Sequence, residues 1–344
     1  MKIAIIGYGG VGKAFLKLVL EKTESLLNEG ILPKVCYVIS SKGGVYDPDG
    51  IDIEKFIEFT KSNKDITHYP CGGSSIISFD TLLHKRDVDF VIEMTPTNKE
   101  TGEPGMTHIV KSLENGFNVI TANKGPVMLA YKKLRDIALR NNVQLGIGCT
   151  TGGALPTINS GVVDMAGSEI KSIEGVLNGT TNFILNEMET YGVEYNQALK
   201  KAQELGIAES DPTLDVEGWD TATKLLILTN VLMDEEKTLD EIKIEGITNI
   251  KVIDIKKAAR EGKKYKLIGK TIKTDNGIQM SVKLECIESN NPLYGVNGKN
   301  KAVKYTSDTL GDLTIIGGAS GVKPAAASIL RDLINIHRGY KYIR

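Results

Sequence analysis

The sequence has few residues of the kinds that build metal centres and disulfide frameworks. Its 344 residues include four histidines, which form no cluster with metal-ligand spacing, so we expect no catalytic metal. The four cysteines, Cys36, Cys71, Cys149 and Cys286, lie far apart and form no CxxC pair. This pattern is typical of reduced, mostly buried thiols in a cytoplasmic protein, and it argues against a zinc site or disulfides.

Excess charge and long apolar runs are also absent. The chain has 42 basic and 43 acidic side chains and no polybasic block, so we expect no nucleic-acid partner. Its longest apolar runs are too short to span a membrane, and Met1 leads directly into a strand pattern instead of a signal peptide. The 41% of hydrophobic residues indicate an ordinary soluble globular protein with a sizeable core, long enough for two domains.

The first 150 residues alternate short apolar runs with helical patterns. We predict strands at Lys2–Ile6, Val35–Ser40, Val88–Met94, Phe117–Thr121 and Val143–Ile147. We predict helices at Val11–Leu27, Met106–Asn115 and Val127–Arg140. Apolar runs that do not alternate, separated by helices, indicate a parallel sheet buried on both faces. Residues 1–150 are therefore predicted to form a doubly wound dinucleotide-binding domain of the Rossmann type.

Residues 151–322 have a different texture, with strands at uneven spacing. Strands are predicted at Ile170–Leu177, Lys270–Thr274, Gly277–Cys286, Ala302–Thr306 and Leu313–Ile316, and helices at Tyr195–Leu205 and Trp219–Leu232. This order favours an α+β domain with a mixed sheet that carries helices on one side. A final amphipathic helix, about 323–338, is expected to pack back on the first domain.

A glycine-rich turn follows the first strand and opens the first helix. It reads Gly7-Tyr8-Gly9-Gly10-Val11-Gly12 and matches GxGxxG. Gly7 permits the tight turn, Gly9 lets the backbone approach a pyrophosphate, and Gly12 lets helix and strand pack closely. The N–H groups from Gly9 to Val11 lie at the helix N-terminus, where phosphates bind. We therefore predict a dinucleotide site here, although glycine-rich turns also occur without ligands.

The end of the second predicted strand bears on the choice between NAD and NADP. NAD enzymes tend to carry an acidic residue there for the ribose 2′-hydroxyl. This chain has Ser40-Ser41-Lys42 instead, and no carboxylate before Asp47. Hydroxyls and an ammonium suit a 2′-phosphate, so Ser40 and Lys42 favour NADP, with NAD possible; a solvated turn is the alternative.

Further motifs follow the glycine turn in a fixed order. They are Thr121–Pro126, Asn178–Asn182, the run from Glu204 to Lys224, Asn291–Leu293 and Gly317–Pro324. With these motifs the sequence resembles homoserine dehydrogenase over almost its whole length. The resemblance implies the short form, without a fused aspartate kinase or a C-terminal regulatory domain. It implies NAD(P)H-dependent, reversible reduction of L-aspartate 4-semialdehyde to L-homoserine, in the biosynthesis of threonine, methionine and isoleucine.

Lys224 is the candidate proton donor. Hydride delivered to an aldehyde leaves an alkoxide, which needs a proton and a nearby positive charge. Asp220 lies four residues earlier, on the same helical face. Such a pair is commonly a surface pair of little energetic weight, but the surrounding helix is apolar, so we expect that Lys224 is not freely solvated. The resemblance implies that Lys224 donates the proton and that Asp220 binds substrate.

The resemblance assigns the other site residues. Substrate binding falls to Gly206, Glu209, Asp215 and Thr180, with Glu209 holding the α-amino group. Lys124 follows a strand at its carboxyl end and is expected to act in catalysis and cofactor binding. Thr95 and Pro96 are expected to line the nicotinamide pocket, and Gly321 to close over the cofactor.

One segment departs from the family pattern. The family's segment begins with a glutamate that binds a structural monovalent cation, together with backbone carbonyls. Here Gly148 stands in its place, and the carbonyls of Thr151, Gly153 and Leu155 remain without a charged ligand. We therefore expect no bound metal. Cys149 could instead suggest a thioester-forming aldehyde dehydrogenase, but a nearby histidine is lacking, and we expect Cys149 to be buried at a strand end.

Two other classes of function remain open from the residues. One is another NAD(P)-dependent amino-acid or hydroxy-acid dehydrogenase on the same fold, and the other is a non-enzymatic nucleotide sensor. Glu209, Asp220 and Lys224 argue against the sensor, which would not need them. By analogy with the family we expect a homodimer through the second domain, where Thr157–Met165 and Gly277–Cys286 are apolar.

Overall fold

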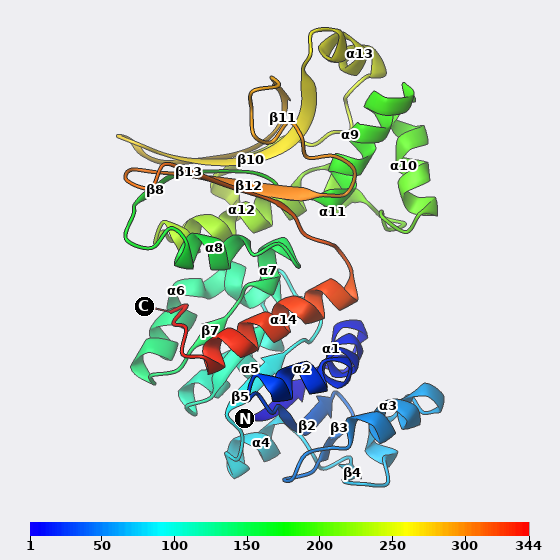
Figure 1. The fold of residues 1–344 in the computed structure, drawn as a ribbon, viewed down its shortest axis with the longest axis vertical. Coiled ribbons are helices and arrows are strands. Elements are labelled where there is room, and N and C mark those ends of the chain that lie inside the picture. Colours follow the sequence, from blue (N-terminus) through cyan, green and yellow to red (C-terminus); the bar gives the residue numbers. More distant parts are fainter. Residues whose placement is uncertain (344) are drawn as a thin grey trace. The chain divides into compact units, whose positions relative to one another are not determined.

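The structure is a computed structural model that describes residues 1–343 (Figure 1). The chain folds into two compact units. The first contains Met1–Thr150 together with the C-terminal residues from Gly321, and the second contains Thr151–Ser320.

A seven-stranded sheet forms the centre of the first unit, in the order β4-β3-β2-β1-β5-β6-β7. The strands are β1 (Lys2–Ile6), β2 (Lys34–Ser40), β3 (Gly43–Tyr46), β4 (Gly73–Ser74), β5 (Phe90–Glu93), β6 (Asn118–Thr121) and β7 (Leu145–Gly146). The pairs β2-β1-β5-β6-β7 are parallel, which confirms the five predicted strands as a parallel sheet. The antiparallel strands β3 and β4 at one edge were not predicted. They are short and rich in glycine, so they lack an apolar run.

Helices surround this sheet. They are α1 (Gly10–Glu21), α2 (Thr23–Asn28), α3 (Ile53–Ser62), η1 (Ile66–His68), α4 (Phe79–Lys85), α5 (Gly105–Glu114), α6 (Lys124–Arg140) and α14 (Val322–His337). The short helix α7 (Cys149–Gly152) spans the boundary of the two units. The prediction of one helix over Val11–Leu27 is wrong, because the chain breaks at Lys22. There the hydroxyl of Thr23 donates to the carbonyl of Val19 at 3.0 Å, competing with the helical backbone pattern.

Strand β1 lies at the centre of this sheet, where the strand order predicts a ligand site. Residues 3–6 are buried, as a parallel strand covered on both faces requires. After β1 the chain crosses through α1 to β2 on one side, and β5 lies on the other side of β1. This reversal of strand order is a topological switch point, and ligands of open α/β sheets bind outside the carboxyl ends of the strands there.

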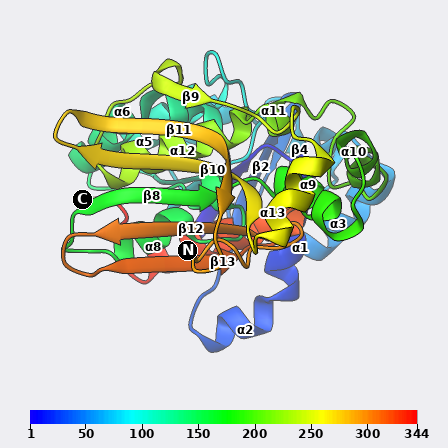
Figure 2. The ribbon, with the colours of Figure 1, turned by 90° about the horizontal axis from the view of Figure 1, so that it is seen from above.

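The second unit contains a six-stranded mixed sheet in the order β13-β12-β8-β10-β11-β9 (Figure 2). The strands are β8 (Ile170–Val176), β9 (Ile242–Ile244), β10 (Lys264–Thr274), β11 (Gly277–Ile287), β12 (Lys301–Ser307) and β13 (Asp312–Gly317). The helices are α8 (Thr157–Val163), α9 (Gly179–Tyr191), α10 (Tyr195–Glu204), α11 (Thr213–Val216), α12 (Trp219–Leu232), η2 (Leu239–Glu241) and α13 (Val252–Arg260). Strand β10 begins six residues earlier than predicted. Its first residues include Lys264 and Lys266, which interrupt the apolar pattern that predicts a strand.

Helix α12 is the helix that carries the candidate proton donor. It contacts β8, β9, β10 and β11, and its residues 221–223 and 225–230 are buried. The apolar residues on several faces of the helix thus reflect burial, as expected for a helix that is hydrophobic all round.

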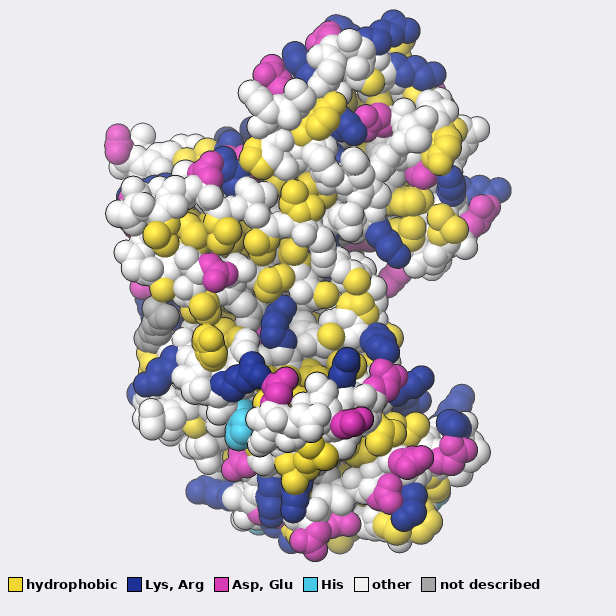
Figure 3. Space-filling model, viewed as in Figure 1, with side chains coloured by type: hydrophobic (Ala, Val, Ile, Leu, Met, Phe, Trp, Pro, Cys, Tyr) yellow, Lys and Arg dark blue, Asp and Glu magenta, His cyan; other side chains and the backbone are white. Residues whose placement is uncertain are grey.

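Basic and acidic side chains lie close to one another on the molecular face drawn in Figure 3. This agrees with the net charge of −1. No helix within residues 1–343 has both the length and the apolar character needed to cross a membrane.

Candidate functional site

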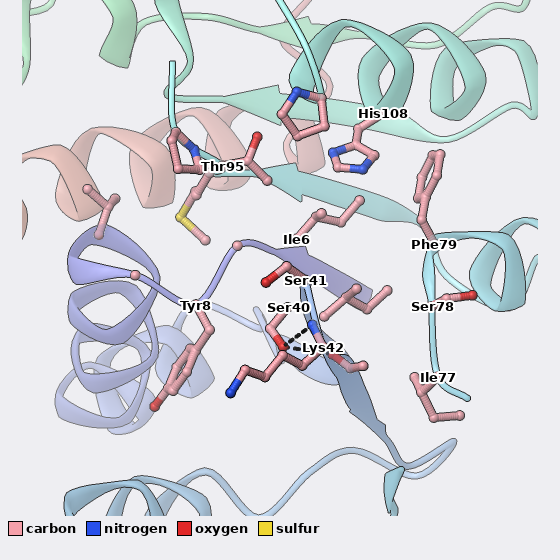
Figure 4. A pocket seen from close by; sticks show the side chains of 18 of the residues that line it. Ile6, Tyr8, Ser40, Ser41, Lys42, Ile77, Ser78, Phe79, Thr95 and His108 are labelled. Atoms are coloured by element: carbon pink, nitrogen blue, oxygen red, sulfur yellow. Dashed lines mark hydrogen bonds between the residues drawn. The ribbon is translucent and has the colours of Figure 1, made fainter. Parts of the chain in front are cut away.

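The first unit contains a cavity of about 900 Å³ at the carboxyl ends of β1, β2 and β5 (Figure 4). Eight of the predicted cofactor residues line it: Gly7, Gly9, Gly10, Val11, Ser40, Lys42, Thr95 and Pro96. The glycine turn, the end of the second strand and the end of β5 therefore meet around one space. Its size suits a ligand larger than a simple metabolite.

The glycine turn has the geometry that its sequence predicts. Gly7 has φ +99°, and a Cβ there would lie 2.6 Å from the backbone of Met94 at the end of β5. A Cβ at Gly12 would lie 2.4 Å from the carbonyl oxygen of Gly7, so this glycine allows the helix to pack against the turn although it does not line the cavity. A Cβ at Gly9 would meet nothing within 4 Å, so the backbone is open there. The first N–H groups of α1 are thus available to a pyrophosphate.

Ser40 to Gly43 form the tip of a hairpin between β2 and β3, since Ser40 pairs with Gly43 across a two-residue turn. The Ser40 hydroxyl donates to the carbonyl of Gly43 at 2.9 Å, and the Lys42 N–H donates to that hydroxyl at 3.3 Å (Figure 4). The Lys42 side chain is 73% exposed, with its ammonium 3.7 Å from a carboxylate oxygen of Asp65. Hydrogen bonding to Thr67 and the charge of Lys42 lower the pKa of Asp65. Among the described residues that line the cavity none is Asp or Glu.

Glu93, which was not predicted from the sequence, holds the part of the cavity lining that contains Thr95. Its fully buried carboxylate accepts the backbone N–H and hydroxyl of Thr95 and, at 2.9 Å, the hydroxyl of Thr121. Asn123 in turn donates weakly to the carbonyls of Thr95 and Pro96, at 3.4 Å. These bonds tie the ends of β5 and β6 together. A glutamate inside an apolar strand pattern was the available signal.

His108 and Phe79 also line the cavity and were not predicted. Their rings meet edge to face with centroids 4.7 Å apart (Figure 4). The Nδ1 atom of His108 is buried and lies 3.8 Å from the Glu93 carboxylate, too far for a hydrogen bond. Their helices, α4 and α5, carry no sequence motif that would have identified them.

Two predicted cofactor residues, Lys124 and Gly321, belong to this unit but do not line the cavity. Lys124 begins α6, directly after its N-cap Asn123, at the carboxyl end of β6. Gly321 is the N-cap of α14. Its neighbour Val322 lies near the glycine turn, 3.2 Å from the position of a Cβ on Gly10.

In the second unit, Lys224, Asp220 and Asp215 are joined by Asn178. The ammonium of Lys224 lies 2.6 Å from a carboxylate oxygen of Asp220 and donates to the carbonyl of Leu177 at 2.8 Å. The side-chain amide of Asn178 donates to Asp215 at 2.6 Å and to Asp220 at 2.9 Å. Both members of the Lys224–Asp220 pair are only 14% exposed. The pair is therefore not the solvated surface pair that spacing alone allowed. We call these four residues the lysine cluster.

Asn178 begins one of the sequence motifs, Asn178–Asn182, but the sequence predicts no role for it. It follows β8 and caps α9, because its side-chain oxygen accepts the N–H of Thr181 at 2.9 Å. One face of the amide thus fixes a helix start and the other holds two carboxylates. An asparagine between a strand and a helix is a common cap, so its second function was hidden.

The remaining predicted substrate residues lie on the loop after α10 and on α9. Thr180 donates through its hydroxyl to the carbonyl of Ile207 at 3.1 Å, which ties α9 to this loop. Gly206 has φ +64° and open space where a Cβ would be. Glu209 is exposed; the amide of Gln203 holds its backbone carbonyl, and no described bond joins its carboxylate to the lysine cluster.

The cysteines differ in part from expectation. Cys71 and Cys286 are exposed, so the prediction of mostly buried thiols is wrong. Cys149 is half-buried at the start of α7, with its thiol 3.6 Å from the carbonyl of Ala325, and it does not end a strand. The strand β7 stops at Gly146 because the chain turns into α7. Within residues 1–343, no three His, Cys, Asp or Glu side chains are grouped as metal ligands would be.

Comparison with known proteins relates both units to dehydrogenases. The profile described as Homoserine dehydrogenase matches residues 156–334, and that described as Glutamate/Leucine/Phenylalanine/Valine dehydrogenase matches residues 1–111. A homoserine dehydrogenase of Methanocaldococcus jannaschii is 40% identical, over 99% of this chain and 100% of its own. An NAD(+)-dependent homoserine dehydrogenase of Pseudomonas canavaninivorans is 34% identical over 98% and 96%. The crystal structure of a putative homoserine dehydrogenase from Archaeoglobus fulgidus has a TM-score of 0.86 at 30% identity, covering 98% and 99%.

Proposed function

The chain belongs to the homoserine dehydrogenase family, and we propose that its lysine cluster carries out the proton transfer of that family's reaction. It is an NAD(P)-dependent oxidoreductase that reversibly reduces L-aspartate 4-semialdehyde to L-homoserine, within the biosynthesis of threonine, methionine and isoleucine. The observation that carries the proposal is the buried pairing of Lys224 with Asp220, reinforced by Asn178. Ionisable pairs held away from solvent concentrate at functional sites.

Lys224 donates the proton in the proposed mechanism. A nicotinamide held in the cavity by the glycine turn, Thr95 and Pro96 would supply a hydride for the aldehyde carbon. The ammonium of Lys224 gives a proton to the developing alkoxide, and its charge stabilises that oxygen before the transfer. Asp220 and the carbonyl of Leu177 hold the ammonium in place, and solvent returns the proton to the amine afterwards. Two interactions with fixed groups keep a flexible lysine in one position.

The other expected substrate residues surround this chemistry with binding groups. Glu209 is proposed to hold the α-amino group by a charge-assisted bond, with the backbone of Gly206 and the loop that Thr180 anchors completing the pocket. Asp215 assists by orienting Asn178. Lys124 in the first unit is proposed to act on cofactor or substrate, and Gly321 to close over the cofactor.

NADP is the proposed cofactor, with NAD as the weaker alternative. The cavity fits a dinucleotide because its backbone is open at Gly9 and the N-terminus of α1 faces it. The hairpin tip would hold the 2′-phosphate through Lys42, and among residues 1–343 no carboxylate that would repel it lines the cavity. Ser40 contributes by shaping the tip, since its hydroxyl is already bonded within the turn. Thr95 and Pro96 line the nicotinamide end.

A homodimer and a cytoplasmic location complete the proposal. Helix α12 packs on one face of the second sheet, whereas Glu174, salt-bridged to Lys270 at 3.2 Å, lies on the other. A second copy would cover that face by two-fold symmetry. Light scattering during size-exclusion chromatography tests the dimer, and a monomer at micromolar concentration would contradict it. The four free thiols suit a reducing cytoplasm.

The direct test of the reaction is the oxidation of NADPH by the purified protein with L-aspartate 4-semialdehyde. We expect saturable turnover with this aldehyde and much slower turnover with simple 2-oxo acids. Efficient turnover of a 2-oxo acid, with none of the semialdehyde, would favour another dehydrogenase on the same fold. Cofactor binding without turnover of any substrate would favour a nucleotide sensor.

A further inference from the structure

Lys301, the first residue of β12, is a buried lysine that the reaction does not use. It is 5% exposed, and its ammonium donates to the carbonyl oxygen of Gly152 at 2.6 Å. Alternate residues of a strand point to the same face, so Tyr305 projects in the same direction. The hydroxyl of Tyr305 donates to the carbonyl of Thr157, also at 2.6 Å. Strand β12 therefore holds both ends of the segment 152–157 with side-chain donors.

This segment is where the family resemblance implies a monovalent cation, between the carbonyls of Thr151, Gly153 and Leu155. The residues present do not fit one. The expected glutamate is replaced by Gly148, and the carbonyl of Leu155 already accepts the N–H of Thr157 at 2.8 Å. The Lys301 ammonium lies beside Gly153, only 3.4 Å from the position that a Cβ would take there.

An ammonium group and an alkali cation carry the same charge and are both solvated by carbonyl oxygens. A buried charge needs such polar partners, and a second cation beside the ammonium would be repelled, strongly so away from water. We propose that the Lys301 ammonium takes the place of the monovalent cation, so that this chain carries its structural cation as a side chain. The second unit then needs neither sodium nor potassium for its stability, whatever substrate the enzyme uses.

Melting temperatures in potassium, sodium and choline chloride, at equal ionic strength, test this. Lys301→Ala removes the ammonium and opens a space, whereas Lys301→Met removes the charge but keeps most of the bulk. Lys304→Met is the matched control, because Lys304 lies on the same strand, points to the other face and pairs with Asp312.

For wild type, we expect the melting temperature to be the same in all three salts. We expect the same independence of the salt for Lys304→Met. Both Lys301 variants should melt lower in choline by roughly 3–8 °C, from the loss of a charged hydrogen bond in a domain of this size. Potassium or sodium should restore Lys301→Ala with a saturable dependence but should not restore Lys301→Met, whose side chain fills the space.

Saturable stabilisation of the wild type by either metal would overturn the proposal, and so would a lowered melting temperature of Lys301→Ala that neither metal raises. If Lys301→Ala does not fold, wild-type crystals soaked in rubidium chloride decide the question. Anomalous scattering from rubidium beside the carbonyl of Gly153 would refute a built-in cation, and a structure without it there would support one.

Discussion

The two units present their candidate sites by different physical means. In the first unit the glycine turn at Gly7–Val11 and the hairpin tip at Ser40–Gly43 present backbone groups to the cavity, and side chains such as those of Phe79 and His108 complete its lining. In the second unit the lysine cluster consists of side chains that hold one another at 2.6 to 2.9 Å. The difference suits two tasks: conformation positions N–H groups for phosphates, and a held charge is needed where a proton moves.

This contrast leads to a separation of effects. Changes in the first unit should alter cofactor affinity or choice, whereas changes in the lysine cluster should alter the rate of the chemical step. A variant that changes both cofactor affinity and the rate of the chemical step would not distinguish the two units. Affinity, rate and stability are therefore measured separately for each variant.

Lys224→Met should give the largest effect. It removes the proton and the charge while keeping most of the bulk. General acid catalysis contributes roughly 10²–10⁴-fold, so we expect kcat to fall at least about 100-fold. NADPH affinity, measured by fluorescence titration, and the melting temperature should stay nearly unchanged, because Asn178 still donates to Asp220.

The control for that variant is the double change Asp220→Asn/Lys224→Met, which removes the carboxylate left without its ammonium. If the folded single variant reduced the semialdehyde at near wild-type rate, the proton would have to come from another group. Lys124 would be the first candidate.

Gly12→Ala and Gly9→Ala separate packing from ligand binding within the first unit. A Cβ at residue 12 would collide with the carbonyl of Gly7, so the turn must shift. We expect a loss of about 1–3 kcal/mol of stability and at least about tenfold weaker NADPH binding. Gly9→Ala meets no neighbour in the fold, so it should weaken binding while its melting temperature stays at the wild-type value. Equal melting temperatures for the two variants would contradict this assignment.

Lys42→Glu should weaken the binding of NADPH more than that of NADH at the hairpin tip. The lysine is exposed and its interactions are screened, so we expect NADPH binding to weaken by only about tenfold, with little change for NADH. Lys61→Glu, on the exposed face of α3 in the same unit, controls for a reversed surface charge. Equal losses for both cofactors would remove Lys42 from the 2′-phosphate site.

Lys266→Met should give the smallest effect, a change in how stability depends on pH. Lys266, like Lys224, is held away from solvent, but it has no carboxylate partner among the described hydrogen bonds. It is buried on β10, and its ammonium donates to two neutral oxygens, those of the Asn182 side chain and the Val296 backbone, instead of a carboxylate. Burial lowers the pKa of Lys266 from 10.5 to about 8 in the folded state. Between these values the unfolded chain holds more protons, so stability relative to Lys266→Met should rise with pH.

Urea unfolding of wild type and Lys266→Met at pH 7 and pH 10 measures this difference. We expect wild type to gain on the order of 1 kcal/mol relative to the variant at the higher pH. Lys270→Met, on the same strand, controls for loss of a charge. A constant difference between wild type and Lys266→Met would mean that Lys266 keeps its proton in the folded protein.

The sequence predicted the parts of the fold that local patterns encode. Burial determines the pattern of apolar residues along an element. The sequence therefore predicted the strands β1, β2, β5 and β6 and the apolar helix α12. The glycine turn was equally accessible, since its function depends on consecutive residues. The hairpin strand β3 was missed because it is short and rich in glycine, and the break at Lys22 was missed because it depends on a local hydrogen bond of the Thr23 hydroxyl.

The lysine cluster shows what spacing cannot encode. Asp220 and Lys224 share a helix and could be paired from the sequence, but Asn178 and Asp215 come from other elements. Only the folded second unit brings the amide of Asn178 onto both carboxylates. Glu93 was hidden for a similar reason, because its partners Thr95 and Thr121 lie on different strand ends.

Isotope transfer tests the central claim most directly. The protein is incubated with L-aspartate 4-semialdehyde and NADPH that carries deuterium at both positions of nicotinamide C4, and the product is analysed by mass spectrometry. Hydride transfer to the aldehyde predicts homoserine with one deuterium on its hydroxymethyl carbon, formed at a rate that Lys224→Met lowers at least about 100-fold. Homoserine without deuterium, or labelled homoserine formed equally fast by the variant, would contradict the account.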